Sequence, residues 1–97
     1  MLQASDISYC SAEDKLVFAF TARGERHTLS QTLTELESTL DPAAFFRLNR
    51  GQIIQLSHVL RLEPFGKDRL AVHMQGGDRA LVPSASRTPE LRQWLEG

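Results

Sequence analysis

Apolar residues in this chain gather in short runs that either alternate with polar residues or stay apolar, and turn-forming residues separate the runs. This pattern favours β-strands, because a helix needs apolar positions three and four residues apart. The sequence predicts strands over residues 7–10, 16–21, 25–29, 45–48, 53–56, 59–62, 69–74 and 79–82. It predicts turns over 12–14, 22–24, 49–51, 64–68 and 76–78, each of which contains glycine, proline or aspartate.

One helix is predicted in the middle of the chain. Thr32 and Glu35 have the spacing of a capping box, and Ser30 is an alternative cap one turn earlier. Leucines then recur at helical spacing, so that one stripe faces the core: Leu33, Leu36 and Leu40. The pair Asp41-Pro42 should end this helix, because a residue before proline avoids the α region.

A second, shorter helix is predicted at the carboxyl end. Thr88 offers an N-cap, and Pro89 suits the first helical position. Leu91, Trp94 and Leu95 would give this helix a buried face. We therefore expect a single mainly β domain over residues 1–97, with one central and one carboxyl-terminal helix.

Composition agrees with a folded domain that stays in the cytoplasm. Of the 97 residues, 41% are hydrophobic and 24% are charged, which differs from the composition of disordered chains. No apolar run approaches the roughly 18–20 residues needed to cross a bilayer, and residues 1–11 lack the pattern of a secretory signal. Cys10 is the only cysteine, which excludes an internal disulfide and a thiolate metal cluster.

Charge is distributed unevenly along the chain. Residues 1–45 carry three cations and seven acidic residues, a net charge of −4, whereas residues 46–97 carry eight cations and five acidic residues, a net charge of +3. Seven of these eight cations are arginine, whose planar fork suits both phosphate and the edge of guanine. Ordinary charge scatter on a solvated surface is the alternative interpretation.

Catalytic and metal-binding patterns are absent from the sequence. His27, His58 and His73 are too widely spread for a zinc site, which needs converging ligands. Neither a G-x-S-x-G nucleophile elbow nor a G-x-x-x-x-G-K-[S/T] phosphate loop occurs. The aromatic residues Phe45, Phe46 and Trp94 are expected in the core. We therefore expect no enzyme activity, no metal and no cofactor.

The stretch from Phe46 to Gln55, FRLNRGQIIQ, resembles the central signature of LytTR domains, in which F-x-R-x-H-R-S is followed by two apolar residues and an asparagine. Other parts of the family pattern follow in the same order along the whole chain: Ile7-Ser8-Tyr9, Lys15 to Thr21, Leu33-Thr34-Glu35-Leu36, Met74 to Leu81, and Val82-Pro83-Ser84. The chain departs from the pattern at Gly51, Gln55 and Ala85.

The resemblance implies an elongated antiparallel β fold that inserts loops, and no recognition helix, into the grooves of DNA. It implies a sequence-specific output domain of a bacterial response regulator that binds promoter repeats in pairs. A receiver or sensory domain would then lie outside these residues. Short loops on a β scaffold suit this role, because base readout needs donors held in fixed positions.

Three loops and a pair of cations would contact duplex DNA according to this resemblance. The first loop carries Lys15, the second is Asn49-Arg50-Gly51, and the third runs from Ser84 to Arg87. The predicted DNA-contacting residues are Lys15, Asn49, Arg50, Lys67, Arg69, Ser84, Ser86 and Arg87. Arg50 is the first choice for a base contact, and phosphate contacts would set the register.

Structural roles remain open for several of these residues. Arg50 could form a surface ion pair, Lys15 could be a solvated turn residue, and Ser84 could bond to local backbone at the end of a strand. The acidic first half and the altered third loop also leave a second function open. In that alternative the same fold serves as a protein-interaction or dimerisation module with weakened or lost DNA binding.

Overall fold

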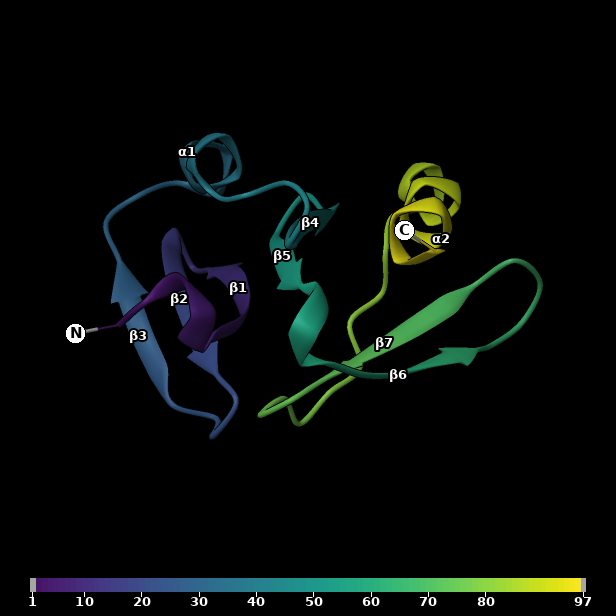
Figure 1. Cartoon of the computed structure of the whole chain (residues 1–97), viewed down its shortest axis with the longest axis horizontal. Coiled ribbons are helices and arrows are strands. Elements are labelled where there is room, and N and C mark those ends of the chain that lie inside the picture. The colour runs from purple at the N-terminus through teal and green to yellow at the C-terminus, as the bar shows by residue number, and fades with distance from the viewer. Residues whose placement is uncertain (1, 97) are drawn as a thin grey trace.

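The computed structural model describes residues 2–96, and it measures 39 × 28 × 25 Å. Met1 and Gly97, the two ends of the predicted domain 1–97, lie outside the described residues. Figure 1 shows a five-stranded sheet beside a two-stranded ribbon, with helix α1 over the sheet and helix α2 over the ribbon. The mainly β fold with two helices that the sequence predicts is therefore confirmed.

All neighbouring strands pair antiparallel. The sheet has the order β3-β2-β1-β5-β4 and consists of β1 (Ile7–Glu13), β2 (Leu16–Thr21), β3 (Arg26–Leu29), β4 (Phe45–Asn49) and β5 (Gln52–Gln55). The ribbon consists of β6 (Val59–Pro64) and β7 (Leu70–Met74). The helices are α1 (Leu33–Thr39) and α2 (Thr88–Glu96), and short 3-10 turns are η1 (Ala4–Asp6), η2 (Leu56–His58) and η3 (Ala85–Arg87).

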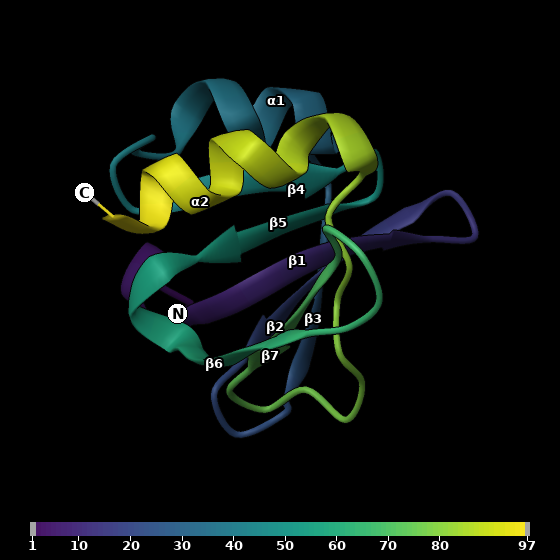
Figure 2. The same ribbon diagram turned by 90° about the vertical axis from the view of Figure 1, so that its right-hand side faces the viewer.

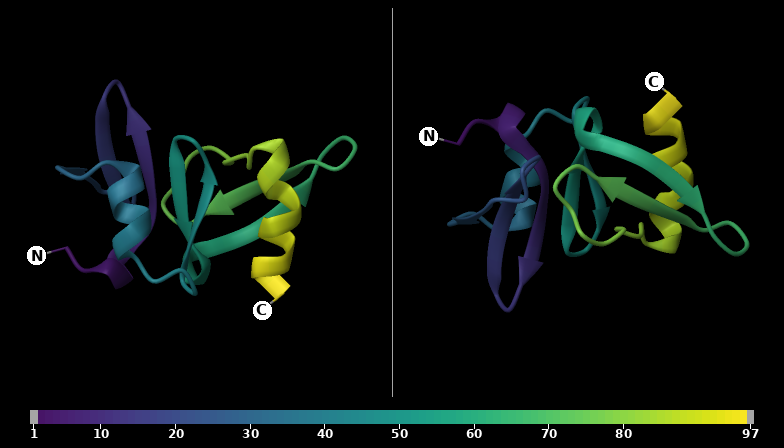
Figure 3. Two further views of the ribbon diagram at one scale, coloured as in Figure 1. Left: turned by 90° about the horizontal axis from the view of Figure 1, so that it is seen from above. Right: turned by 90° about the horizontal axis from the view of Figure 1, so that it is seen from below.

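The five-stranded sheet is covered on both faces, and this produces two hydrophobic cores. Helix α1 covers one core, which consists of Ile7, Cys10, Ala19, Leu33, Leu36, Phe45 and Ile53. Strand β7 and helix α2 cover the other, which consists of Tyr9, Phe46, Leu48, Ile54, Leu70, Val72, Met74, Leu81 and Leu91. Figure 3 shows strands β4 and β5 between these two layers.

The double cover explains why burial does not alternate along β1. All five residues from Ile7 to Ser11 are buried, including two serines. Ser8 lies at the interface with the ribbon, where its hydroxyl donates to the Gln75 carbonyl over 2.7 Å. Burial also raises the pKa of the Cys10 thiol to about 11, so this residue stays protonated at neutral pH.

Helix α1 begins as the sequence predicts. The Thr32 hydroxyl accepts from the Glu35 amide over 3.1 Å, and the Glu35 carboxylate accepts from the Thr32 amide over 2.8 Å. This reciprocal pair identifies Thr32, and not Ser30, as the cap. The helix ends at Thr39, slightly before the expected stop, and Leu40 takes an extended conformation.

The first predicted turn, over residues 12–14, was placed too early. Strand β1 continues to Glu13, which pairs with Leu16, so only Asp14 and Lys15 form the turn. Both residues have positive φ, at 49° and 70°, as a tight two-residue hairpin requires. Neither residue is glycine. Asp14 is the turn-forming residue of the pair, but it begins the turn, whereas the prediction placed it at the end.

The predicted strand over 79–82 was wrong. This segment makes one isolated bridge, in which Leu81 and Val72 exchange hydrogen bonds of 2.7 and 2.8 Å. The chain then turns to β4, where the Ser84 amide donates to the Leu48 carbonyl over 3.2 Å. Pro83 has no amide hydrogen with which to extend the ladder.

The predicted cap of the second helix was also wrong. Thr88 already has helical angles, with φ −60° and ψ −46°, and it follows directly on the 3-10 turn η3. Its hydroxyl donates to the Ser84 carbonyl over 3.3 Å instead of accepting from the helix. The predicted buried face of α2 is confirmed for Leu91, while Trp94 and Leu95 are half-buried against the same core.

A close backbone contact holds the sheet and the ribbon together. Gly76, with φ +76°, packs so tightly against the turn after β2 that a Cβ atom there would overlap the backbone of Thr21 and Gly24. Buried Gln55 donates to the carbonyls of Ala4 and Ile7, which fixes the amino-terminal segment. Among the described residues, no helix is long and apolar enough to cross a membrane.

Candidate functional site

Four turns that carry predicted contact residues lie on the same side of the molecule. Figure 2 shows the β1–β2 turn, the β4–β5 turn, the β6–β7 loop and the start of α2 along its right-hand side. The view from above in Figure 3 agrees, and in both views the carboxyl-terminal end of α2 points the other way. The fold therefore brings together turns that are up to about seventy residues apart in sequence, from Asp14 to Arg87.

The β4–β5 turn is held from inside the protein by one arginine. Arg47 Nε donates to the Asn49 carbonyl over 2.9 Å, and Arg47 Nη2 donates to the Arg50 carbonyl over 2.6 Å. The remaining nitrogen, Nη1, pairs with Glu37 of helix α1 over 3.1 Å. A single guanidinium thus ties the backbone of this turn to a neighbouring helix.

The Asn49 side chain holds the same turn from within. Its carbonyl oxygen accepts from the Gly51 amide over 2.9 Å, which closes a local side-chain turn. Its amide nitrogen donates to the Gln52 side chain over 3.0 Å and to the Val82 carbonyl over 2.8 Å. Asn49 is half-buried and bonded within the protein, whereas the neighbouring Arg50 is exposed.

The segment before α2 is attached to strand β4 beside this turn. Arg87 Nε donates to the Arg47 carbonyl over 3.0 Å, and the guanidinium lies 4.5 Å from the centre of the Phe46 ring. Arg87 Nη1 also pairs with Glu90 over 2.7 Å. The predicted second and third loops therefore form one connected unit.

Two pockets lie on either side of the segment 82–88. The first, of about 280 Å³, is lined by Glu37, Arg47, Asn49, Arg50, Ser84, Ser86 and Arg87. The second, of about 550 Å³, is lined by Phe65, Lys67, Asp68, Arg69, Leu70, Val82, Pro83, Ala85 and Thr88. Seven of the eight predicted contact residues line one of these two pockets, and Lys15 lines neither.

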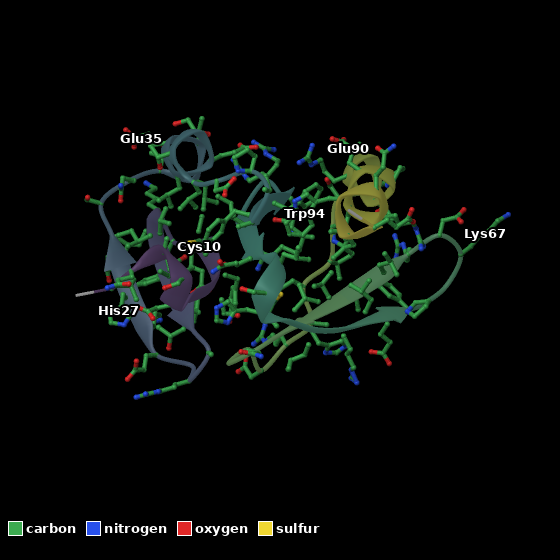
Figure 4. All side chains as sticks on the ribbon, viewed as in Figure 1. Cys10, His27, Glu35, Lys67, Glu90 and Trp94 are labelled. Atoms are coloured by element: carbon green, nitrogen blue, oxygen red, sulfur yellow. The ribbon has the colours of Figure 1, made fainter. Side chains whose placement is uncertain are left out.

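The β6–β7 loop differs from the β4–β5 turn in having few internal bonds. Its backbone is closed by the Phe65 amide, which donates to the Arg69 carbonyl over 3.0 Å. The Arg69 guanidinium lies 5.8 Å from the centre of the Phe65 ring. Figure 4 shows Lys67 extending from the far end of this loop, away from the rest of the molecule.

Sequence reasoning missed Arg47 and Glu37. Arg47 was passed over because it stands inside the predicted strand, between Phe46 and Leu48, and not in a loop. A lone charge in an apolar strand is nevertheless a signal, because a charge near the core needs hydrogen-bonding partners. Glu37 carried no such signal, since an exposed glutamate on a helix is common.

The predicted absence of a metal site is not contradicted by the described residues, in which no three histidine, cysteine or acidic side chains could hold an ion together. His73 bonds to Glu63 over 2.8 Å, and His58 bonds to the Ser5 carbonyl over 3.0 Å. His27 lies on β3, at the end of the molecule opposite Lys67 (Figure 4). His27 and His58 line one pocket together with Asp6 and Glu25, whereas His73 does not line it.

Comparisons with known proteins identify similar chains. The model of the LytTr DNA-binding domain family matches residues 1–96. The transcriptional regulatory protein YpdB of Escherichia coli K12 is 30% identical over 91 residues, which are 94% of this chain and 37% of that protein. The sensory transduction protein LytT of Bacillus anthracis is 28% identical over 95 residues, which are 98% of this chain and 38% of that protein.

A solved structure has the same fold. It is the LytTr DNA-binding domain of a methyl-accepting/DNA response regulator from Bacillus cereus, with a TM-score of 0.87 and 23% identity. The match covers 99% of this chain and 86% of that one. The chain spans less than two fifths of the length of both curated relatives, so it corresponds to one part of each of them.

Proposed function

Because the chain belongs to the LytTr DNA-binding domain family, we propose that it binds specific duplex DNA through the four turns that share one side of the molecule. The family is a DNA-binding regulatory domain and not a family of enzymes. Transcription regulation is the process in which this binding acts. Family membership disfavours the alternative of an interaction module that has lost DNA binding.

One observation carries the proposal: four cations from separate segments of the chain line two neighbouring pockets on one side of the molecule. Arg50 stands beside Arg87 at one pocket, and Lys67 and Arg69 stand at the other. Phosphates attract such clusters without regard to sequence, whereas the guanidinium fork of arginine can also read guanine. The net charge of −1 belongs to the whole chain, whereas residues 46–97, which supply all four of these cations, carry a net charge of +3.

The eight residues have different proposed roles. Arg50 reads a base, because its side chain is exposed on the turn that has the most internal support. Lys15, Lys67 and Arg69 contact phosphates. Ser84 and Ser86 add hydroxyl contacts. Asn49 and Arg87 hold the first pocket in shape, and the solvent-facing part of each side chain contacts the DNA.

The longer relatives support a role as the output domain of a response regulator that acts in the cytoplasm. In this proposal a receiver or sensory domain lies outside residues 1–97, and two copies bind neighbouring promoter repeats. The supporting observation is that one relative is named for transcriptional regulation and another for sensory transduction, and each is more than twice the length of this chain.

Selection of bound duplexes from a random pool tests the function directly. We expect one enriched sequence and a steep loss of its affinity with salt, because each neutralised phosphate releases counterions. Arg50→Ala should lose about 1–3 kcal/mol of preference for the enriched sequence. Recovery of a random pool after selection would contradict specific binding, and equal preference in the variant would remove Arg50 from the base contacts.

A further inference from the structure

We propose that Arg47 is the positioning residue for sequence readout: it fixes the β4–β5 turn so that Arg50 meets the DNA in one orientation. This inference rests on the proposed function, and it concerns a residue that does not itself touch a base. The Arg47 side chain is only 20% exposed, and its three donor positions are directed at protein groups.

The β4–β5 turn needs such support because strand β4 is irregular just before it. Register shifts between Arg47 and Asn49, so β4 carries an extra residue just before the turn. A bulge of this kind disrupts the ladder and leaves polar groups without a partner strand. Arg47 bonds to two successive carbonyls there, those of Asn49 and Arg50, and short bonds from a charged donor are among the stronger ones in proteins.

Two further polar groups of the turn are also paired. The Gly51 amide donates to the Asn49 side chain, and the Gly51 carbonyl accepts from the Ala12 amide over 2.8 Å. Arg50, by contrast, is exposed and lines the first pocket. Because the backbone beneath it is already ordered, Arg50 loses less conformational entropy on binding DNA than it would on a mobile loop.

Charge alone cannot explain the arrangement. Glu37 accepts one Arg47 donor, so part of the Arg47 charge is neutralised within the protein. A lysine at this position would keep the charge but could not bond to two carbonyls and a carboxylate in one plane. Positioning and phosphate contact therefore predict different results for Arg47→Lys.

The experiment measures affinity for the selected duplex and for a random duplex as a function of salt. It uses wild type, Arg47→Lys, Arg50→Ala and the double variant. We expect Arg47→Lys to bind the selected duplex about tenfold or more weakly, as for the loss of one good base contact. Its affinity for random duplex and its salt slope should equal those of the wild type, because no charge is lost.

The double variant separates positioning from an independent contact. If Arg47 acts through Arg50, then adding Arg47→Lys to Arg50→Ala should weaken binding no further. Additive losses would overturn the inference, as would an unchanged affinity in Arg47→Lys. If Arg47→Lys weakened binding to both duplexes equally, and Arg47→Gln reduced the salt slope by about 0.9, Arg47 would instead be a phosphate contact.

A second variant keeps the test decisive if Arg47→Lys does not fold. Glu37→Gln removes the carboxylate that holds Arg47 Nη1, and it should lower the ratio of affinities for the selected and random duplexes, with no further lowering when it is added to Arg50→Ala. Measurements on the wild type distinguish failure of this inference from failure of the proposed function. Absence of any sequence preference in the wild type would refute the proposed function itself, whereas failure of the inference alone leaves that preference intact.

Discussion

The β4–β5 turn and the β6–β7 loop both present cations on the same side of the molecule, but they are built differently. In the first, Arg47, Asn49 and Ala12 fix the backbone of the turn. In the second, every residue from 61 to 69 is exposed, and one hydrogen bond closes the loop. Base readout needs fixed donors, whereas attraction to phosphate tolerates movement, so the difference in construction indicates a difference in role.

Packing beneath the two regions differs as well. Leu48 of β4 is 0% exposed, whereas Leu60 of β6 is 61% exposed. Strand β6 is the outer strand of the ribbon, so much of its surface has no cover within the described residues. The more tightly packed region therefore carries the residue that we propose for base readout.

Leu48→Ala should have the largest effect on stability, because it leaves a cavity in the core below the β4–β5 turn. We expect the free energy of unfolding to fall by about 2–5 kcal/mol. Leu60→Ala is the matched control, and it should change this free energy by no more than about 0.5 kcal/mol. Urea unfolding of both variants makes the comparison, and similar midpoints would show that the two regions do not differ in packing.

Lys67→Ala should change the salt dependence of binding more than its specificity. The salt slope should fall by about 0.9, because one phosphate contact is lost, and the selected and random duplexes should be weakened alike. Arg50→Ala is the contrasting variant, with its loss confined mainly to the selected duplex. Titrations at several salt concentrations measure both quantities, and a selective loss in Lys67→Ala would give the flexible loop a part in readout.

Substitutions of Lys15 test whether the β1–β2 turn acts like the fixed β4–β5 turn or like the β6–β7 loop. Its φ of +70° is a conformation that a lysine adopts at a cost. Lys15→Gly should relieve this strain and stabilise the fold by a net value of about 1 kcal/mol or less.

Lys15→Ala is the matched control, because it removes the same charge and keeps the strain. Both variants should weaken DNA binding to the same extent, while only the glycine variant raises the melting temperature. Unequal binding by the two variants would mean that the shape of the turn, and not only the lysine charge, contributes to recognition.

The smallest effect on stability should come from a substitution in the exposed part of the β6–β7 ribbon. A hydrogen bond from His73, aided by the charges of Arg61 and His73, lowers the pKa of the Glu63 carboxyl. This pKa is lower in the folded than in the unfolded protein, so the stabilisation is present above the unfolded pKa of about 4.3. It is lost as the pH falls through the folded value.

His73→Ala should return the Glu63 pKa towards its ordinary value with little change in stability, because the pair is exposed. An NMR titration of the Glu63 carboxyl in wild type and variant measures the change. Identical titration curves would show that His73 does not bond to Glu63 in solution.

Local sequence signals predicted those features that depend on neighbours in the chain. The capping box of Thr32 and Glu35 fixed the start of α1, and glycine at position 24 marked a hairpin turn where φ is +82°. Segment 79–82 was predicted wrongly as a strand, because its pattern of residues suits a strand but its neighbours in space allow only one bridge at Leu81.

The predicted contact residues also show that local sequence does not reveal contacts between distant segments. Sequence alone placed Asn49 and Arg50 together as loop residues of one kind, but in the structure one side chain is bound within the protein and the other is exposed. The partner that Asn49 finds in Val82 is 33 residues away. Such a bond has no local signature, so sequence could not assign the two residues different roles.

What the sequence determined by itself was the kind of domain: short strands, two helices, an arginine-rich second half and the ordered pattern of the family. These follow from spacing and composition, which are properties of the chain. Tertiary structure alone decided that Arg47 spans two carbonyls and Glu37, and that four separate turns share one side. Hydrogen bonds and pockets depend on distances in space, and distant segments acquire those distances only when the two cores pack.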